Sequence, residues 1–244
     1  MNNDNDDDAP LFRLFWENSK LNARTAQGFA ERLDEDARTA PRVAQLFYPG
    51  ASHALPRPTD PLAEVMRRRR SDRAFGAAPL DERQLGSLFH AFVHSDDGRR
   101  ALPSAGGKYP IEVFAFLLRV QGPLAGAIVH YAGDVHGVTR VGTCPLWDEL
   151  AGSVGLAVEG VPAALFVFAA LPERATAKYG ERGGRFLLLE CGHYAQNLAL
   201  RAAAEGLVGV ATGGLHDDRV RTWLGLDRTG AMIPLGYACG AAVR

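Results

Sequence analysis

The sequence predicts an α+β fold, because helices and strands are mixed along the chain without the strict alternation of a Rossmann domain. Two observations support this prediction. Several segments repeat apolar residues at helical spacing, and several short apolar runs have the length and bulk of buried strands. The chain has 244 residues, of which 47% are apolar, and this is enough for a large core in a globular protein.

The clearest helix start lies in the stretch DPLAEVMRRRR. Asp60 can cap the helix, Pro61 suits its first position, and Arg67–Arg70 lie at the C-terminal end, where the helix dipole favours cations. A second helix is predicted in the stretch PLDERQLGSLFHAFVHSDD. Its apolar residues fall on one helix face, at Leu85, Leu88, Phe89, Phe92 and Val93.

Three further helices are predicted. A polar helical segment covers roughly Leu11 to Arg42, and a short helix is capped by Asp217 or Asp218 and runs to Leu226. The stretch Phe186–Gly206 is helical and apolar on most sides. We expect such a helix to be buried in a core or in a subunit interface.

The strands are expected in the apolar runs between these helices. Ile111–Val120 has the composition of a central strand covered on both faces, because its residues are mostly apolar and aromatic. Ala127–Gly133, Val161–Leu171 and Ala231–Gly240 are expected to form further strands. The stretch GVATGG, residues 209–214, is predicted to be a turn.

The chain divides into three parts. Residues 1–10 are expected to form a disordered acidic tail, because they have nothing to bury. Residues 11–60 contain the N-terminal helical segment and then a proline-rich linker. Residues 61–244 carry the remaining predicted elements and form the main domain.

Composition excludes several classes of protein. The net charge is −1, so no overall field attracts nucleic acid or a membrane surface. The acidic N-terminus differs from a signal peptide, and no apolar run of about 18 residues is present, so we expect a cytoplasmic protein. The three cysteines form no CxxC pair, and His90 and His94 lack the HExxH glutamate, so no metal site is expected.

The basic run Arg67–Arg70 allows two interpretations. A charge run at a helix end is usually a solvated face. Here the run continues into RRSDRAF, where the Ser71 hydroxyl lies between Arg70 and Arg73, and arginine side chains match the geometry of phosphate. We therefore expect a small phosphorylated ligand at this segment.

The stretch PSAGGKY, residues 103–109, also allows two interpretations. It can be a tight turn before a strand, or a loop whose missing side chains let a flat ligand approach the backbone. In the second case Lys108 and Tyr109 stand beside that ligand. A lysine ammonium group favours the phenolate form of a neighbouring tyrosine, and such a pair can move a proton near neutral pH.

Four motifs in this order resemble the nitroreductase-like flavoproteins, and more narrowly the SagB-type (McbC-like) azoline dehydrogenases. They are RRSDRAF, PSAGGKYPIEVFAF, ECGHYAQNLALRAAAEGL and GVATGG; the segments FWENSKLN and HALPRP are also similar. The resemblance covers roughly residues 15 to 240. It implies a homodimer with FMN at the interface, and a central mixed, mainly antiparallel sheet flanked by helices.

The resemblance also implies roles for individual residues. The FMN phosphate and ribityl contacts would be Arg69, Arg70, Ser71 and Arg73. The loop that meets the flavin ring, often that of the partner subunit, would be Pro103, Ser104, Ala105 and Gly107. Gly213 and Gly214 would face the reactive edge of the ring. Gln196 and Asn197 would lie near the cofactor, or else form hydrogen bonds between helices. A basic phosphate contact late in the chain is in doubt unless Arg244 supplies it.

The implied reaction is oxidation of peptide thiazolines or oxazolines to thiazoles or oxazoles in modified-peptide biosynthesis. Lys108 and Tyr109 match the pair that separates azoline oxidisers from plain nitroreductases. We expect Tyr109 to be the base, with Lys108 holding it near the phenolate form. If both residues lie inside the strand, their side chains point to opposite faces, only one reaches the substrate, and the roles can be exchanged. A separate cyclodehydratase would have to make the azoline in the peptide substrate. The alternatives are an NAD(P)H-dependent nitro- or quinone reductase, a non-catalytic scaffold subunit, and an enzyme for carrier-tethered azolines.

Overall fold

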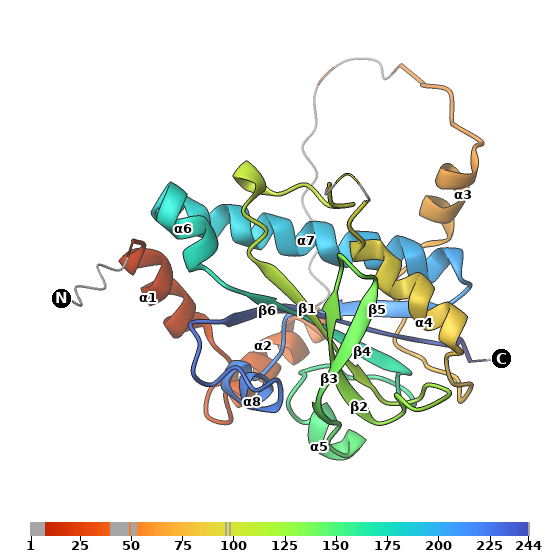
Figure 1. The fold of residues 1–244 in the computed structure, drawn as a ribbon. Coiled ribbons are helices and arrows are strands. Elements are labelled where there is room, and N and C mark those ends of the chain that lie inside the picture. Colours follow the sequence, from red (N-terminus) through yellow and green to blue (C-terminus); the bar gives the residue numbers. More distant parts are fainter. Residues whose placement is uncertain (1–7, 40–48, 50–52, 96, 98, 244) are drawn as a thin grey trace.

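The computed structural model describes residues 8–39, 49, 53–95, 97 and 99–243. The first seven residues of the expected acidic tail, much of the proline-rich linker and Arg244 lie outside the described residues. The tail prediction is wrong at its end, because Ala9 is buried and Pro10 begins a helix. The chain forms a six-stranded sheet in the order β3-β2-β1-β4-β6-β5. Every pair of neighbouring strands is antiparallel, and helices cover both faces of the sheet (Figure 1). This arrangement confirms the expected α+β architecture.

The three central strands are the most deeply buried elements. They are β1 (Ile111–Leu117), β4 (Ala164–Ala170) and β6 (Met232–Gly240), and β1 and β4 pair along their whole length. Their side chains alternate between two separate apolar clusters, one on each face of the sheet. This two-sided burial confirms the prediction of a covered central strand at 111–120, and the runs at 161–171 and 231–240 form strands as expected.

Helix α7 (Glu181–Ala204) covers one face of the sheet, together with α4 (Glu82–Phe89) and the short 3-10 helix η1 (His90–Phe92). Leu187, Cys191 and Leu198 of α7 are buried in the same cluster as Phe166 and Phe168 of β4. The α4–η1 segment buries Leu85, Leu88, Phe89 and Phe92, as its periodicity predicted. Val93, also expected on this face, follows η1 and is only half-buried.

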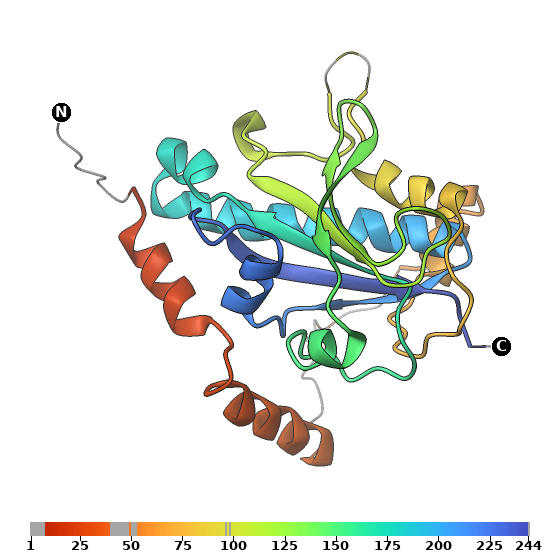
Figure 2. The ribbon, with the colours of Figure 1, turned by 60° about the horizontal axis from the view of Figure 1, so that its bottom comes forward.

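The other face is covered by α5 (Trp147–Ala151) and α8 (Asp217–Trp223). Figure 2 shows both short helices on the side of the sheet away from α7. Leu150 and Val220 are fully buried there, and the Trp223 ring meets the edge of Phe116 with ring centroids 6.0 Å apart.

Four more helices lie outside these layers: α1 (Pro10–Ser19), α2 (Ala26–Thr39), α3 (Pro61–Arg68) and α6 (Glu173–Tyr179). The expected helical segment at 11–42 is therefore broken at residues 20–25. In α1 the Phe12 ring packs on Gly184, where a Cβ atom would lie 2.4 Å from the ring, so α7 needs glycine at this contact. At α3 the Asp60 carboxylate accepts a hydrogen bond from the Ala63 N–H at 3.0 Å, which confirms the predicted cap.

Two local predictions are wrong. The stretch GVATGG is not a turn, because its first four residues belong to strand β5 (Val208–Thr212), which pairs with β6 along its length. Asp217 and Asp218 are not N-caps: both lie inside the first turn of α8, and the cap position is His216. The sequence also gave no indication of β3 (Gly137–Thr143), which pairs with β2 (Ala127–Ala132) at the edge of the sheet.

Within the described residues, no helix is both long and apolar enough to cross a membrane. Cys144, Cys191 and Cys239 are all free thiols. No cluster of three or more His, Cys, Asp or Glu side chains suited to a metal ion occurs in the described part of the chain.

Asp217 makes stability depend on pH. Burial raises the pKa of its carboxyl group to about 6, although hydrogen bonds from its own N–H and that of Leu21 act in the opposite direction. Because the folded protein binds this proton more tightly than the unfolded chain, the stabilisation is present at low pH and is lost as the pH rises through about 6.

The variant Asp217→Asn should remove this titration. Between about pH 4 and pH 7, its unfolding free energy should rise relative to wild type by up to about 3 kcal/mol, at about 1.4 kcal/mol for each pKa unit. Urea unfolding at several pH values measures the difference, with the exposed Asp148→Asn as control. A difference between Asp217→Asn and wild type that stays constant over this range would contradict the prediction.

Candidate functional site

A cation-lined cavity of about 390 Å³ lies where the C-terminal end of α3 meets α7 and β5. Arg67 and Arg68 form ion pairs with Glu64, at N–O distances of 2.8 and 3.7 Å. Arg70 forms an ion pair with Asp72 at an N–O distance of 3.4 Å. Among the described residues no carboxylate pairs with the half-buried Arg69. The cavity therefore offers one guanidinium group that is free to bind an anion. Its lining is Arg67, Arg68, Arg69, Arg70, Ala199, Ala203, Gly206, Leu207, Val208, Gly209, Tyr237 and Ala242.

The backbone after the arginines is fixed on β5. Ser71 forms a parallel bridge with Gly209, and the Asp72 N–H donates to the Gly209 carbonyl at 3.1 Å. A Cβ atom at Gly209 would lie 2.6 Å from the Tyr237 hydroxyl, so glycine is needed for this approach. Ser71 and Arg73 are exposed and lie outside the cavity lining. The structure thus brings Arg69 and Arg70 together at the cavity, with Ser71 next to its lining residue Gly209. The Arg73 backbone instead accepts a hydrogen bond from the Glu159 N–H at 2.9 Å.

Gly213 and Gly214 directly follow β5. Gly213 is exposed and has open space where a Cβ atom would project, whereas Gly214 packs against Gly155. The Gly214 N–H donates to the Thr212 hydroxyl at 3.2 Å, which fixes the turn. From Gly209 to Gly213 a strand rises about 13 Å. An elongated ligand with an anionic end at the arginines and a flat end at Gly213 therefore matches this strand.

The loop that carries Lys108 and Tyr109 is built around η2 (Ala105–Gly107). Gly106 adopts φ +60°, and a Cβ atom there would lie 2.3 Å from the Tyr179 hydroxyl, so only glycine fits. The Ser104 hydroxyl accepts the Tyr109 N–H at 2.8 Å and closes the loop. Tyr109 itself has φ +44°, a left-handed conformation that is unfavourable for a residue with a bulky side chain.

The side chains of Lys108 and Tyr109 have different surroundings. Lys108 is exposed, and its ammonium group has no partner among the described residues. The Tyr109 ring lies under the Arg100 guanidinium, whose carbon is 3.9 Å from the ring centroid. The Tyr109 carbonyl accepts a hydrogen bond from Arg174 Nη1 at 3.0 Å. The cation found against this tyrosine is therefore Arg100, which the sequence did not indicate.

A polar cavity of about 330 Å³ lies next to this loop, lined by Arg100, Glu112, His130 and Tyr194 among others. Glu112 accepts from Arg174 at 2.6 Å and lies 2.8 Å from His130 Nε2. Burial alone would raise the pKa of Glu112, but the hydrogen bonds from His130 and Arg174 hold it below its usual range. The Arg174 side chain, which bonds the Tyr109 carbonyl, is therefore neutralised by Glu112.

Gln196 and Asn197 have different positions on α7. Gln196 is exposed. Asn197 Nδ2 lies 3.4 Å from the Ala91 carbonyl and 3.5 Å from the Ala101 carbonyl, so it ties α7 to the segment before the Lys108–Tyr109 loop. Because Ala91 lies in η1, the first of these contacts is the hydrogen bond between helices that was the alternative for Asn197.

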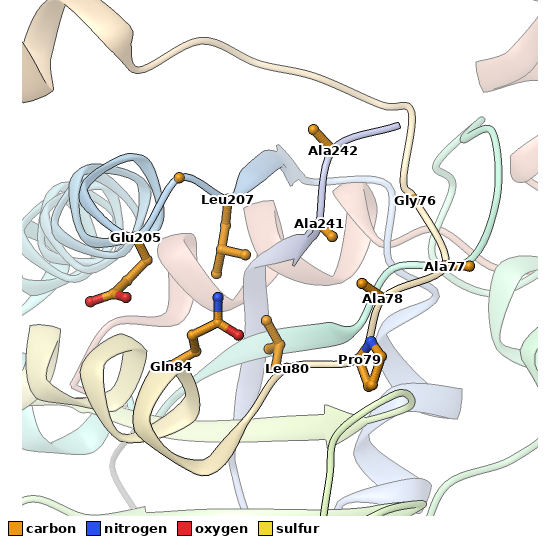
Figure 3. A pocket seen from close by; sticks show the side chains of 11 residues that line it. Gly76, Ala77, Ala78, Pro79, Leu80, Gln84, Glu205, Leu207, Ala241 and Ala242 are labelled. Atoms are coloured by element: carbon orange, nitrogen blue, oxygen red, sulfur yellow. The ribbon is translucent and has the colours of Figure 1, made fainter. Parts of the chain in front are cut away.

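Figure 3 shows a third cavity, of about 530 Å³, between the start of α4 and the last residues of the chain. It adjoins the arginine cavity at Gly206 and Leu207. Its one charged lining residue is Glu205, which already accepts hydrogen bonds from Arg83 at 2.8 Å and Ser87 at 2.6 Å. Because this cavity offers no cation, the arginine cavity is the better site for a phosphate.

The arginine cavity and the Lys108–Tyr109 loop lie at opposite ends of α7. Ser104 interacts electrostatically with Glu190 of α7, whereas Ala199 and Ala203 of α7 line the arginine cavity. At about 1.5 Å per residue, the distance along α7 from Glu190 to these two residues is about 14–20 Å. Figure 1 shows the same relation, with α6 at one end of α7 and α3 at the other. One copy of the chain therefore does not bring the two groups of predicted site residues together.

Residues 66–237 match the Nitroreductase family. Over 167 residues the chain is 34% identical to the nitroreductase-like protein MJ1384 of Methanocaldococcus jannaschii, covering 66% of this chain and 82% of that protein. It is also 34% identical over 149 residues to the microcin B17-processing protein McbC of Escherichia coli, covering 58% of this chain but only 54% of McbC.

A solved structure is similar over more of the chain. It is the E. coli microcin synthetase McbBCD complex with truncated pro-MccB17 bound. One chain of that complex superposes with a TM-score of 0.70 at 28% identity, covering 89% of this chain and 87% of the other.

Proposed function

The chain belongs to the nitroreductase family, and from this premise we propose that it is an FMN-dependent azoline dehydrogenase acting on modified peptides. The observation that carries the proposal is the Lys108–Tyr109 turn. Tyr109 is held at its N–H, its carbonyl and its ring, while no described residue bonds its hydroxyl or the Lys108 ammonium group. Tyr109 is thus positioned, and both proton-transfer groups are left free for a substrate.

The residues present fit FMN. The arginine cavity supplies Arg69 and Arg70 for the phosphate, and Ser71 is bridged to its lining residue Gly209. The open space at Gly213 leaves room for a flat ring beside the end of β5. When bound, FMN supplies a two-electron acceptor for a hydride.

The chain's own residues would handle the proton. Oxidation of an azoline removes a proton from Cα and a hydride from Cβ, and a ring double bond forms between them. Tyr109 as phenolate would take the Cα proton, with the Lys108 ammonium group near its charge. Because β1 begins only at Ile111, the strict alternation of strand side chains does not separate the pair.

A homodimer would unite the two halves of the site. The separation along α7 means that the loop of residues 103–109 reaches an FMN only if a second copy brings one. Exposed apolar side chains lie on α1 and on the facing part of α7, where α1 packs on Gly184; their exposed fractions are 68% for Leu11, 59% for Leu14, 56% for Phe15, 38% for Leu188 and 62% for Leu189. We infer that a second copy covers this patch.

A second candidate is an NAD(P)H-dependent nitro- or quinone reductase, which the similarity to MJ1384 favours. A non-catalytic scaffold subunit is a third, because the similar solved chain belongs to a multi-protein complex with a peptide. The proposed dehydrogenase would likewise need a partner, a cyclodehydratase that makes the azoline. The substrate can be a ribosomal peptide or a carrier-tethered one.

The first prediction from the proposed function concerns the cofactor. Arg69→Ala should weaken FMN binding by about tenfold to a hundredfold, because a free guanidinium contact to phosphate is lost. Arg67→Ala should weaken it less, because Glu64 already neutralises Arg67 at 2.8 Å. Fluorescence titration of the apoprotein with FMN measures both, with Arg228→Ala as a distant control. A wild type that binds no FMN would refute the cofactor assignment.

The second prediction concerns assembly. Light scattering should give twice the chain mass of 26.3 kDa, and the interface should bury more than about 2,000 Å² in total. Leu189→Asp should weaken the dimer, because it places a charge in the apolar patch. Val135→Asp, at a residue 73% exposed in the turn between β2 and β3, is the matched control. A stable, flavin-loaded wild-type monomer would contradict the dimer.

The third prediction concerns catalysis. Tyr109→Phe loses only the hydroxyl, so it should fold and bind FMN but oxidise a thiazoline peptide about 10²–10⁴-fold more slowly. Lys108→Ala should also be slow, and should recover in part as the pH rises and more phenolate forms. The measurement is flavin reduction by a synthetic thiazoline peptide under anaerobic conditions.

The outcomes separate the candidate functions. Wild-type rates in Tyr109→Phe would remove the tyrosine from the mechanism. A wild-type protein that is reduced by NAD(P)H and never by the azoline would be a nitro- or quinone reductase. Bound flavin that neither donor reduces would favour the scaffold.

A further inference from the structure

Three polar side chains on the buried side of α7 all reach one short segment. Glu190, Tyr194 and Asn197 follow one another at spacings of four and three, which places them in one row on the helix. Ser104 and Arg100 are the groups that lower the pKa of Glu190. Tyr194 and Arg100 line the same polar cavity, and Asn197 Nδ2 lies 3.5 Å from the Ala101 carbonyl. This row of α7 therefore faces residues 100–104.

Glu190 is the unusual member of this row. Its exposed fraction is 3%, and it lies between apolar residues that pack on the sheet. Burying a carboxylate is unfavourable unless hydrogen bonds and charge compensate it. Burial raises the pKa of Glu190, while the Ser104 hydrogen bond and the Arg100 charge lower it. Its Oε1 has no hydrogen-bond partner among the described residues, so its described compensation comes from Ser104 and Arg100.

The same two residues hold Tyr109. The Ser104 hydroxyl, which lowers the pKa of Glu190, accepts the Tyr109 N–H at 2.8 Å. The Arg100 guanidinium lies 3.9 Å from the Tyr109 ring centroid. Because Tyr109 has the unfavourable φ of +44°, its conformation persists only where the surroundings enforce it. Ser104 and Arg100, which make these two contacts, are also the two residues that act on Glu190.

We propose that Glu190 is a positioning residue that fixes Tyr109 for proton transfer, acting through Ser104 on its backbone and through Arg100 on its ring. This role rests on the proposed function, because it presumes that Tyr109 is the base. Glu190 touches neither the substrate nor the hydroxyl of Tyr109. Its removal should therefore misplace the base without removing any group that reacts.

The test uses Glu190→Gln, Glu190→Ala and Ser104→Ala in the full chain loaded with FMN. Glu190→Gln keeps the shape and an acceptor for Ser104 but loses the charge that attracts Arg100. Glu82→Gln, at an exposed carboxylate in the first turn of α4, is the control. The first readout, hydrogen–deuterium exchange of residues 104–110, depends on neither the substrate nor the reaction.

We expect exchange at residues 104–110 to be about tenfold faster in all three variants, and unchanged in Glu82→Gln. The rate of flavin reduction by a thiazoline peptide should fall about tenfold to a hundredfold, with KM for the peptide unchanged, because a small displacement of a reacting group has effects of this size. Glu190→Gln should be the milder of the two Glu190 variants.

Wild-type exchange and wild-type rates in Glu190→Gln and Glu190→Ala would overturn the proposal. A slower reaction with unchanged exchange would also overturn it, because Glu190 would then act other than by holding the loop. If Glu190→Ala does not fold, Glu190→Gln and Ser104→Ala decide the question. If the wild type never oxidises the azoline, the proposed function fails, while the exchange data still show whether Glu190 holds the loop.

Discussion

The packing of α7 on the sheet is the constraint on which the rest of the structure depends. Its inner side chains complete the cluster that covers β1, β4 and β6, so its position and rotation are set by close packing. Gly183 and Gly184 allow Ala175 of α6 and Phe12 of α1 to approach its first turn. Because this helix cannot slide or turn without opening the core, every polar group it carries has a fixed place.

Because α7 is fixed on the sheet, the candidate site is divided between the two halves of this helix. The N-terminal half of α7 carries Glu190, which faces the Lys108–Tyr109 loop, and the C-terminal half lines the arginine cavity with Ala199 and Ala203. The separation is built into the helix, so no local rearrangement within one chain can close it. A second copy of the chain is therefore the simplest way to complete the site, and the apolar patch on α1 and α7 has the chemistry for such a contact.

Much of the fold could be predicted from local patterns. The buried strands and the α4 helix have strong periodicity, and the cap at Asp60 has clear chemistry. The strand β5 was missed because Gly209, Gly213 and Gly214 look like turn residues; the first is glycine because Tyr237 crosses over it. The edge strand β3 was missed because its residues are mostly exposed and polar. Arg100 and Glu190 were missed because their roles depend on which segments α7 brings together, and spacing along the chain does not show this.

The two glycines before Lys108 determine how Tyr109 is placed relative to strand β1. Gly106 and Gly107 both have positive φ, at +60° and +65°, and Gly106 lies directly against Tyr179. They turn the chain so sharply that Tyr109 also enters the left-handed region just before β1 begins. A tyrosine inside the strand would point to one face of the sheet and be covered there. Placed before the strand, and held by Ser104, Arg100 and Arg174, it keeps its hydroxyl free of the described protein groups while its ring and backbone are fixed. This combination of a fixed ring and an unbonded hydroxyl is what a general base requires.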